Sequence, residues 1–242
     1  MITTTTITTP VTAMTTSHDP ALYRLLTWLS PSYPVGAFSY SQGLETAVAL
    51  GLVSDAASLR DWLESSLSGG TLWSDAVVFA RAHEAVRFTG ICSLDEVVEF
   101  AAAFQPSAEL RMETMAQGAA FLKVTAQAWP STTLEKLQHM QDREIAYPVA
   151  VGCAACSHGI GRGIALDAWV HAAVSNLVSA AIRLVPLGQT SGQRVLAAIE
   201  PAIADAVTLA QQTLLADLAT NNFVAEICSM KHETQTTRLF RS

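Results

Sequence analysis

Apolar residues recur at steps of three and four along most of the chain, a spacing that predicts a succession of amphipathic helices. The first helix is expected to begin at Asp19-Pro20, a capping residue followed by proline, and to end before Pro31 and Pro34. Further helices are predicted from about residue 39 or 41 to 50, and over 54–67, 71–88, 93–105, 107–129, a short stretch after 131, from 148 onwards, and 167–185. No segment alternates with period two, so the pattern predicts an all-α protein.

A last long helix is predicted from near Ser191, because apolar residues continue at helical spacing far toward the C-terminus. These residues are Leu196, Ile199, Ile203, Val207, Ala210, Leu214 and Leu218. Pro201 lies inside this run and is expected to kink or split the helix near Glu200. A glycine-rich stretch at 159–163 is expected to act as a hinge. We therefore expect a single-domain helical bundle of roughly ten helices without an internal repeat.

Both ends of the chain differ in composition from this bundle. Residues 1–18 contain nine threonines in the first 16 positions and are expected to form a disordered tail. Residues 19–220 carry the helical pattern. Residues 221–242 form a separate C-terminal segment. From Met230 to Ser242 it is polar and locally basic, and Arg238 and Arg241 flank Leu239 and Phe240 there. Arginine beside an aromatic residue is typical of an interface anchor, so this segment is predicted to bind a partner.

The composition narrows the class of protein. Half of the residues are apolar, 14% are charged, mean hydropathy is +0.30 and 39 residues are alanine, which favours closely packed helices and large buried contacts. A net charge of −7 without a basic stripe argues against nucleic acid as a partner. The start of the chain has no features of a signal or transit peptide, and four cysteines are too few for a disulfide scaffold, so a cytoplasmic protein is expected.

The most apolar stretch, residues 168–187, is nevertheless not predicted to span a membrane. It contains His171, Asn176 and Arg183, which favours a buried core or interface helix.

One constellation could bind a metal. Cys153, Cys156 and His158 lie on a short helical stretch, and thiolate and imidazole suit zinc or nickel. The surrounding residues are small and apolar, which favours a packed helix instead, and no second Cys/His pair occurs at zinc-site spacing. A small Cys/His metal-binding protein thus remains an alternative hypothesis, with no cofactor as the main expectation.

Signals for catalysis are weak. The loop at 186–193 is rich in glycine but lacks the lysine of a phosphate-binding P-loop, and no strand precedes it. No nucleophile elbow or paired general acid and base stands out. We expect no catalytic residues, although an enzyme whose site is assembled only in space stays open as a second alternative.

Two segments stand out, and they carry a resemblance to a known family. The segment with two prolines and two glycines reads Pro31-x-x-Pro34-Val35-Gly36-Ala37-Phe38-Ser39-Tyr40-Ser41-x-Gly43-Leu44-Glu45. Gly43 inside an expected helix suggests that another backbone passes close by. Two further segments run from Pro186 to Gln193 and from Met230 to Ser242. In their residues, order and separation, the three segments resemble the UreF family of urease accessory proteins.

The resemblance implies an all-α protein without enzymatic activity that dimerises and joins the accessory proteins UreD (also called UreH) and UreG, a GTPase. Together they act on apo-urease and deliver nickel and carbon dioxide to its dinickel centre; the UreF component recruits UreG and modulates its GTP hydrolysis. By matching position, the resemblance assigns a group of partner-binding residues. They are Pro34, Gly36, Phe38, Tyr40, Glu45, His232, Glu233, Arg238, Leu239, Phe240 and Arg241. The cysteine pair matches no motif of the family.

Overall fold

The computed structural model describes residues 19–88, 93–140 and 143–242, and within them it contains α-helices, two short 3₁₀ turns and no strand. The elements are α1 (Pro20–Trp28), η1 (Ala37–Ser39), α2 (Leu44–Ala49), α3 (Ala56–Gly69), α4 (Thr71–Arg87), α5 (Leu94–Ala103), α6 (Ala108–Ala128), α7 (Thr132–Gln138), α8 (Tyr147–Ser157), α9 (Arg162–Leu184), α10 (Gln189–Ala210), η2 (Leu215–Asp217) and α11 (Phe223–His232). The all-α prediction is confirmed, and the eleven α-helices of the described residues come close to the ten expected. The threonine-rich tail at 1–18 lies outside the described residues.

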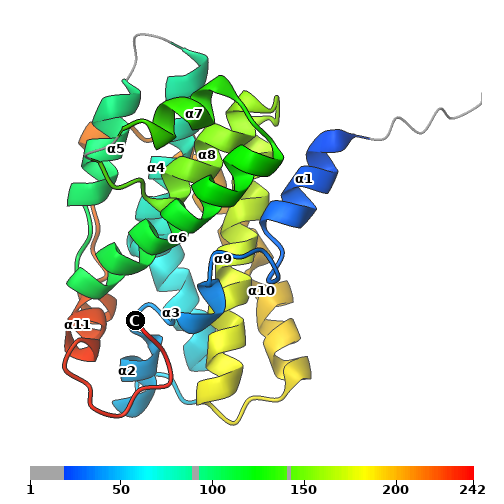
Figure 1. Ribbon diagram of the computed structural model, residues 1–242. Helices are drawn as coiled ribbons and strands as arrows, with labels where there is room; N and C mark the ends of the chain where they lie inside the picture. Colours follow the sequence, from blue (N-terminus) through cyan, green and yellow to red (C-terminus); the bar gives the residue numbers. More distant parts are fainter. Residues whose placement is uncertain (1–18, 89–92, 141–142) are drawn as a thin grey trace, which may run out of the picture.

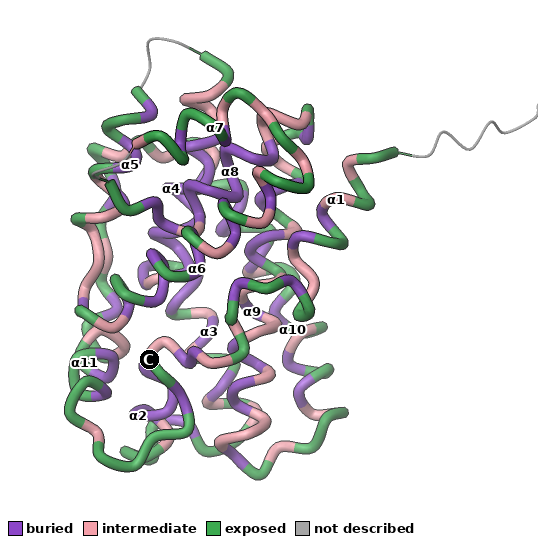
Figure 2. Tube along the Cα trace, viewed as in Figure 1, coloured by how far each residue is buried: buried purple, intermediate pink, exposed green. Residues whose placement is uncertain are grey.

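The core is built around α8, which is small and apolar throughout (Figure 1). It packs most extensively against α4 and also against α6, while α9 packs against α10 and α4. Small residues permit this close approach: a Cβ atom on Gly152 would lie 2.7 Å from the carbonyl oxygen of Phe79 on α4. The helices that surround α8 therefore bury one continuous apolar interior, seen as the purple segments of Figure 2.

Two parts of the molecule matter for the functional site. Helix α1 projects from the rest of the bundle, and Leu22, Tyr23 and Leu26 on it are exposed (Figure 1). At the opposite end, α2, α11 and the chain terminus come together, although α2 and α11 lie almost 180 residues apart in the sequence (Figure 1).

The predicted helix starts are confirmed where a capping side chain marks them. Asp19, Asp55, Ser93, Ser107 and Ser131 each accept a hydrogen bond from a backbone N–H in the first turn of α1, α3, α5, α6 and α7. Because these bonds are local, the sequence alone reveals them.

The expected helix from residue 39 or 41 to 50 is wrong in its first half. The chain instead forms the turn η1, and α2 begins only at Leu44. Gln42 and Gly43 adopt positive φ angles of 55° and 79°, which an α-helix cannot contain. The reason is the close backbone that Gly43 was expected to signal: a Cβ atom there would lie 2.7 Å from the amide nitrogen of Ser229 on α11.

The last long helix also differs from the prediction. Helix α10 starts two residues before Ser191 and ends at Ala210, where Arg81 donates a 2.7 Å hydrogen bond to the carbonyl oxygen of Gln211. Pro201 does not split it, because packing against α9 and α3 holds the helix on both sides of the proline. The stretch 159–163, expected to act as a hinge, forms most of the short connection between α8 and α9 and the first two residues of α9, which begins at Arg162 rather than 167.

Helix α9 is the one helix of the described residues that is long and apolar enough to cross a membrane by length and composition. Half of its most apolar window is buried against the other helices, as expected for the core helix of a soluble bundle.

Candidate functional site

The two segments singled out in the sequence meet in space. We call residues 31–45 the N-terminal motif and residues 233–242 the C-terminal strap. The strap follows α11, crosses α2 and ends beside η1, so that the amide of Arg241 donates to the carbonyl oxygen of Ser39 at 2.8 Å. This hydrogen bond holds the end of the strap against the N-terminal motif.

A single buried carboxylate connects motif and strap. The side chain of Glu45 accepts hydrogen bonds from the amides of Leu239 at 2.6 Å and Phe240 at 3.0 Å, and lies 3.1 Å from Nε2 of His232. Glu45 is 8% exposed and His232 is fully buried. Hydrogen bonds to a charged group are worth more than neutral ones, so Glu45 fixes the path of the strap.

His232 lies between two carboxylates. Its Nδ1 is 2.6 Å from Glu109 on α6, while its Nε2 faces Glu45. Both ring nitrogens are thus engaged by carboxylate oxygens. Arg238 completes the cluster with a 2.6 Å ion pair to Glu109. Pairing of this kind offsets the free energy of removing charged groups from water. We call Glu45, Glu109, His232 and Arg238 the charge cluster.

The end of the chain is held by a second polar network. Backbone and hydroxyl of Ser41 both donate to the carbonyl oxygen of Ser242, at 2.8 and 2.6 Å. The hydroxyl of Ser242 donates to Glu113 at 2.6 Å, and Gln42 and Gln117 donate to the same carboxylate. Burial raises the pKa of Glu113 to about 7, although these three hydrogen bonds act in the opposite direction.

Arg183 on α9 holds the other edge of this junction. Its guanidinium lies 3.6 Å from the ring centroid of Phe38 and 4.3 Å from that of Phe240, and it donates to the carbonyl oxygen of Phe38 at 3.0 Å. An arginine between two aromatic faces contributes cation–π attraction on both sides. The motif, the strap and α9 thus form one rigid unit.

The predicted residues fall into two groups. Tyr40, Glu45, His232 and Phe240 are buried and hold the junction together. The others are accessible: Pro34, Gly36, Phe38, Glu233, Arg238, Leu239 and Arg241. Leu239 and Phe38 are each 62% exposed. The buried polar contacts of the junction thus hold two apolar side chains at the surface.

Sequence reasoning missed the partners of these residues on α6 and α9. Glu109, Glu113 and Arg183 lie in ordinary helical sequence, where acidic residues in a first turn or a basic residue in a last turn are common. One signal for Glu113 was available in the sequence. It lies on the same face of α6 as Leu110 and Gln117, so it is a charged residue on a buried face.

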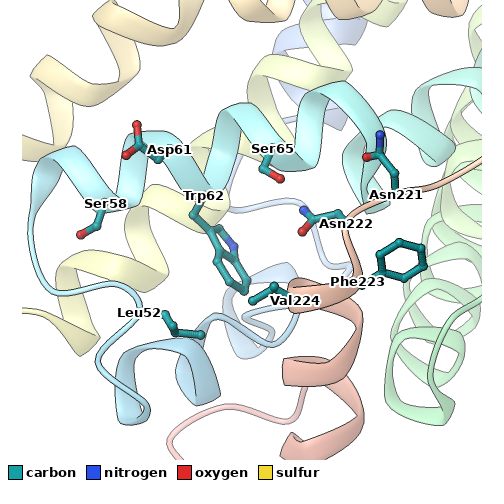
Figure 3. A pocket seen from close by; sticks show the side chains of 9 residues that line it. All are labelled: Leu52, Ser58, Asp61, Trp62, Ser65, Asn221, Asn222, Phe223 and Val224. Atoms are coloured by element: carbon teal, nitrogen blue, oxygen red, sulfur yellow. The ribbon is translucent and has the colours of Figure 1, made fainter.

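Helix α11, which the sequence analysis did not predict, turns apolar side chains outward. Phe223, Val224, Ile227 and Met230 are each between 47% and 65% exposed, and we call them the α11 face. A hollow of about 410 Å³ lies beside its first turn, where Trp62 reaches from α3 toward Leu52 and Val224 (Figure 3). Asn222 lines this hollow, and its Nδ2 atom is buried without a hydrogen-bond partner in the part of the chain that the structure describes.

A larger cavity of about 600 Å³ lies between α1, the N-terminal motif, α4, α6 and α9. Leu22, Leu26, Phe38 and Ile164, all more than half exposed, form its apolar rim. Asp75, which is 9% exposed, also lines this cavity. Burial, together with the negative charge of Glu113, raises the pKa of Asp75 to about 8.

The cysteine pair does not resemble a metal centre. Cys153 is fully buried, and its thiol contacts the carbonyl oxygen of Ala82 at 3.8 Å. Burial raises the pKa of both Cys153 and Cys156, which disfavours the thiolate that binds metal. Nδ1 of His158 lies 2.8 Å from the carbonyl oxygen of Ala154 and is engaged there. Over the described ranges, no three His, Cys, Asp or Glu side chains are grouped so that they could hold a metal ion.

Comparison with known proteins gives a consistent result. The UreF family model matches residues 53–200. The chain is 50% identical over 235 residues to the urease accessory protein UreF of Rhodopseudomonas palustris strain BisB5, covering 97% of each chain. It is 50% identical over 230 residues to that of Bradyrhizobium sp. strain BTAi1 and 46% identical over 222 residues to that of Bradyrhizobium diazoefficiens, covering 95% and 92% of each chain.

Replacing Glu45 by Gln should release the strap without unfolding the helices. The amide group cannot accept all three hydrogen bonds and leaves His232 facing one carboxylate fewer, a loss of about 2–3 kcal/mol in strap docking. We expect trypsin to cleave after Arg238 at least about tenfold faster, as measured by mass spectrometry, with an unchanged helical circular dichroism spectrum. Glu233→Gln is the control, because Glu233 is exposed and a glutamine oxygen can still accept the hydrogen bond that the amide of Ala108 donates to it; equal cleavage of both variants would contradict the assignment.

Replacing Asp75 by Asn should change how stability depends on pH. A carboxyl with a raised pKa in the folded state binds a proton that the unfolded chain releases, so its contribution to stability falls as pH rises from about 4 to about 8. The variant lacks this fall. Between pH 5 and pH 8, we expect the free energy of unfolding of the variant to rise by about 2 kcal/mol or more relative to that of the wild type, as measured by urea unfolding. The exposed Asp205→Asn serves as control, and parallel pH profiles for Asp75→Asn and the wild type would disprove the expectation.

Proposed function

The chain belongs to the UreF family of urease accessory proteins, and we propose that it serves as a non-catalytic scaffold in the GTP-dependent insertion of nickel into urease. In this proposal it binds the accessory protein UreD (UreH), recruits the GTPase UreG and brings both to apo-urease in the cytoplasm. The protein needs no cofactor of its own for this role, and nickel is cargo that the assembled complex delivers.

The observation that carries the proposal is the junction of motif and strap. Buried charges and hydrogen bonds hold a rigid backbone there, and the same backbone presents Phe38, Leu239 and Arg241 to solvent. Interfaces draw most of their binding energy from a few pre-organised apolar and arginine side chains surrounded by polar contacts. A surface built in this way suits the binding of a protein, whereas it offers no arrangement of a nucleophile and a base.

We assign UreD (UreH) to the side of the molecule formed by the strap and the α11 face. Leu239 and the α11 face are exposed apolar residues on two consecutive segments of the chain. The hollow beside Trp62 extends this surface and could accept one apolar side chain of the partner (Figure 3). Apolar residues at the centre and Lys231, Arg238 and Arg241 nearby give the composition of a protein interface.

We assign self-association to the opposite side, where α1 and α9 border the large cavity. Helix α1 makes few contacts within its own chain, yet it exposes Leu22, Tyr23 and Leu26. A second copy that covers α1 and Ile164 would remove this surface from water, and a two-fold arrangement would do so for both copies. A homodimer formed in this way leaves the strap and the α11 face of each copy free.

Replacing Leu239 by Asp should weaken UreD (UreH) binding without affecting the fold. The strap is held through the backbone amide of Leu239, whereas its side chain is exposed. We expect at least about a tenfold loss of affinity, because an apolar interface anchor typically contributes more than 1 kcal/mol. Affinity is measured by calorimetry with purified UreD, and Leu209→Asp, a similarly exposed position on α10, is the control. Unchanged binding by Leu239→Asp would refute this assignment of the interface.

Replacing both Leu22 and Leu26 by Asp should yield a monomer. Four charges would be buried at the interface of a two-fold dimer without partners, which is strongly unfavourable. Analytical ultracentrifugation checks the result: the wild type should sediment as a dimer and the variant as a monomer with the same circular dichroism spectrum. A variant that remains dimeric would place the dimer interface elsewhere on the molecule.

A further inference from the structure

A groove of about 800 Å³ runs along a face of α6 that neither the junction nor the α1 side uses. Met112, Met115, Ala116, Ala119, Leu122 and Lys123 line it from α6. These positions recur at steps of three and four, so they form one stripe of the helix about 16 Å long. The end of α7 and residues 143–145 form the opposite wall.

The groove has an apolar floor and a wall of small residues. Met115, Leu122, Leu137 and Ile145 lie at its base and are nearly buried. Above them, Ala116 and Ala119 are exposed and leave the backbone of α6 accessible. Small side chains allow a second helix to approach within about 8–10 Å, and flexible methionines adapt to the side chains of a partner.

The rim of this groove is positively charged, in contrast to the rest of the molecule. Of the residues that line it, Arg111, Lys123 and Arg143 are basic and Glu144 is acidic, whereas the whole chain carries a net charge of −7. Arg111 pairs with Glu144 and Arg143 with Asp95, but Lys123 has no ion-pair partner among the described residues. A cationic rim around an apolar floor attracts a ligand with the opposite charge pattern.

We propose that this groove binds an amphipathic helix of about three turns from another protein, whose apolar stripe enters the groove and whose flanking residues are acidic. The width and the apolar floor suit a helix laid into a groove, a common mode of peptide recognition. The charge of the rim selects for glutamate and aspartate at the edges of that helix. The groove borders the strap at Ala108, whose amide donates to Glu233. None of the residues assigned to partner binding lines the groove, so the inference does not rest on the proposed function.

Two synthetic peptides of about 14 residues test the proposal on the full-length protein. Both carry leucines on one face and form helices; the first has glutamates beside the leucines and the second has lysines. We expect the acidic peptide to bind at least about tenfold more tightly in fluorescence anisotropy at low salt, because its glutamates pair with Lys123 and the lysines of the second peptide are repelled by the same basic rim. This preference should shrink in about 1 M salt, where charges are screened.

Variants of the protein locate the binding. Lys123→Glu combined with Arg143→Glu should reverse the preference, whereas Arg60→Glu with Arg194→Glu, which changes the net charge equally on α3 and α10, should leave it unchanged. Ala119→Trp fills the groove and should abolish the binding of both peptides; Ala116→Trp replaces it if the first variant does not fold. The proposal is overturned if the acidic peptide has no preference over the basic one, if the tryptophan variant still binds, or if the glutamate pair alters only the self-association of the protein.

Discussion

The carboxylate of Glu45 is the interaction on which the functional end of this molecule depends. It lies in a segment near the N-terminus, yet all of its hydrogen bonds come from the last eleven residues of the chain. An ionised carboxylate is expensive to bury, so it must find donors, and the two strap amides and His232 supply them. The other ring nitrogen of His232 faces the carboxylate of Glu109, and Glu109 accepts from Arg238. One connected network thus joins α2, α6, α11 and the strap.

This dependence connects stability to function. The groups that hold the strap are buried, whereas the groups available to a partner are exposed on the same short segment: Leu239 lies beside Phe240, and Arg241 beside Ser242. A partner that binds Leu239 meets a backbone that is already ordered and does not have to fix a flexible tail, which lowers the entropic cost of association. The partner-binding positions expected from the resemblance to the UreF family are therefore of two kinds, and only the exposed kind is suited to direct contact.

The sequence was informative wherever a structural signal was local. Capping residues marked five helix starts, helical periodicity predicted the all-α class, and Gly43 indicated a close backbone before its neighbour Ser229 was known. It was uninformative where the signal depended on distant residues. Helix α11 exposes its apolar positions, so its pattern does not resemble a core helix. The partners of Glu45 and His232 lie over a hundred residues away, and no local spacing connects them.

Amide hydrogen exchange at Leu239 and Phe240 in the full-length protein tests this account most directly. Their N–H groups donate to Glu45, so exchange requires that the charge cluster opens. We predict that both amides are protected to a degree similar to the amides of α2. When Glu45 is replaced by Gln, protection should fall at the two strap amides and in α2. Exchange of the two amides at the rate of an unstructured peptide in the wild-type protein would contradict the account, because the strap would then not be held by Glu45.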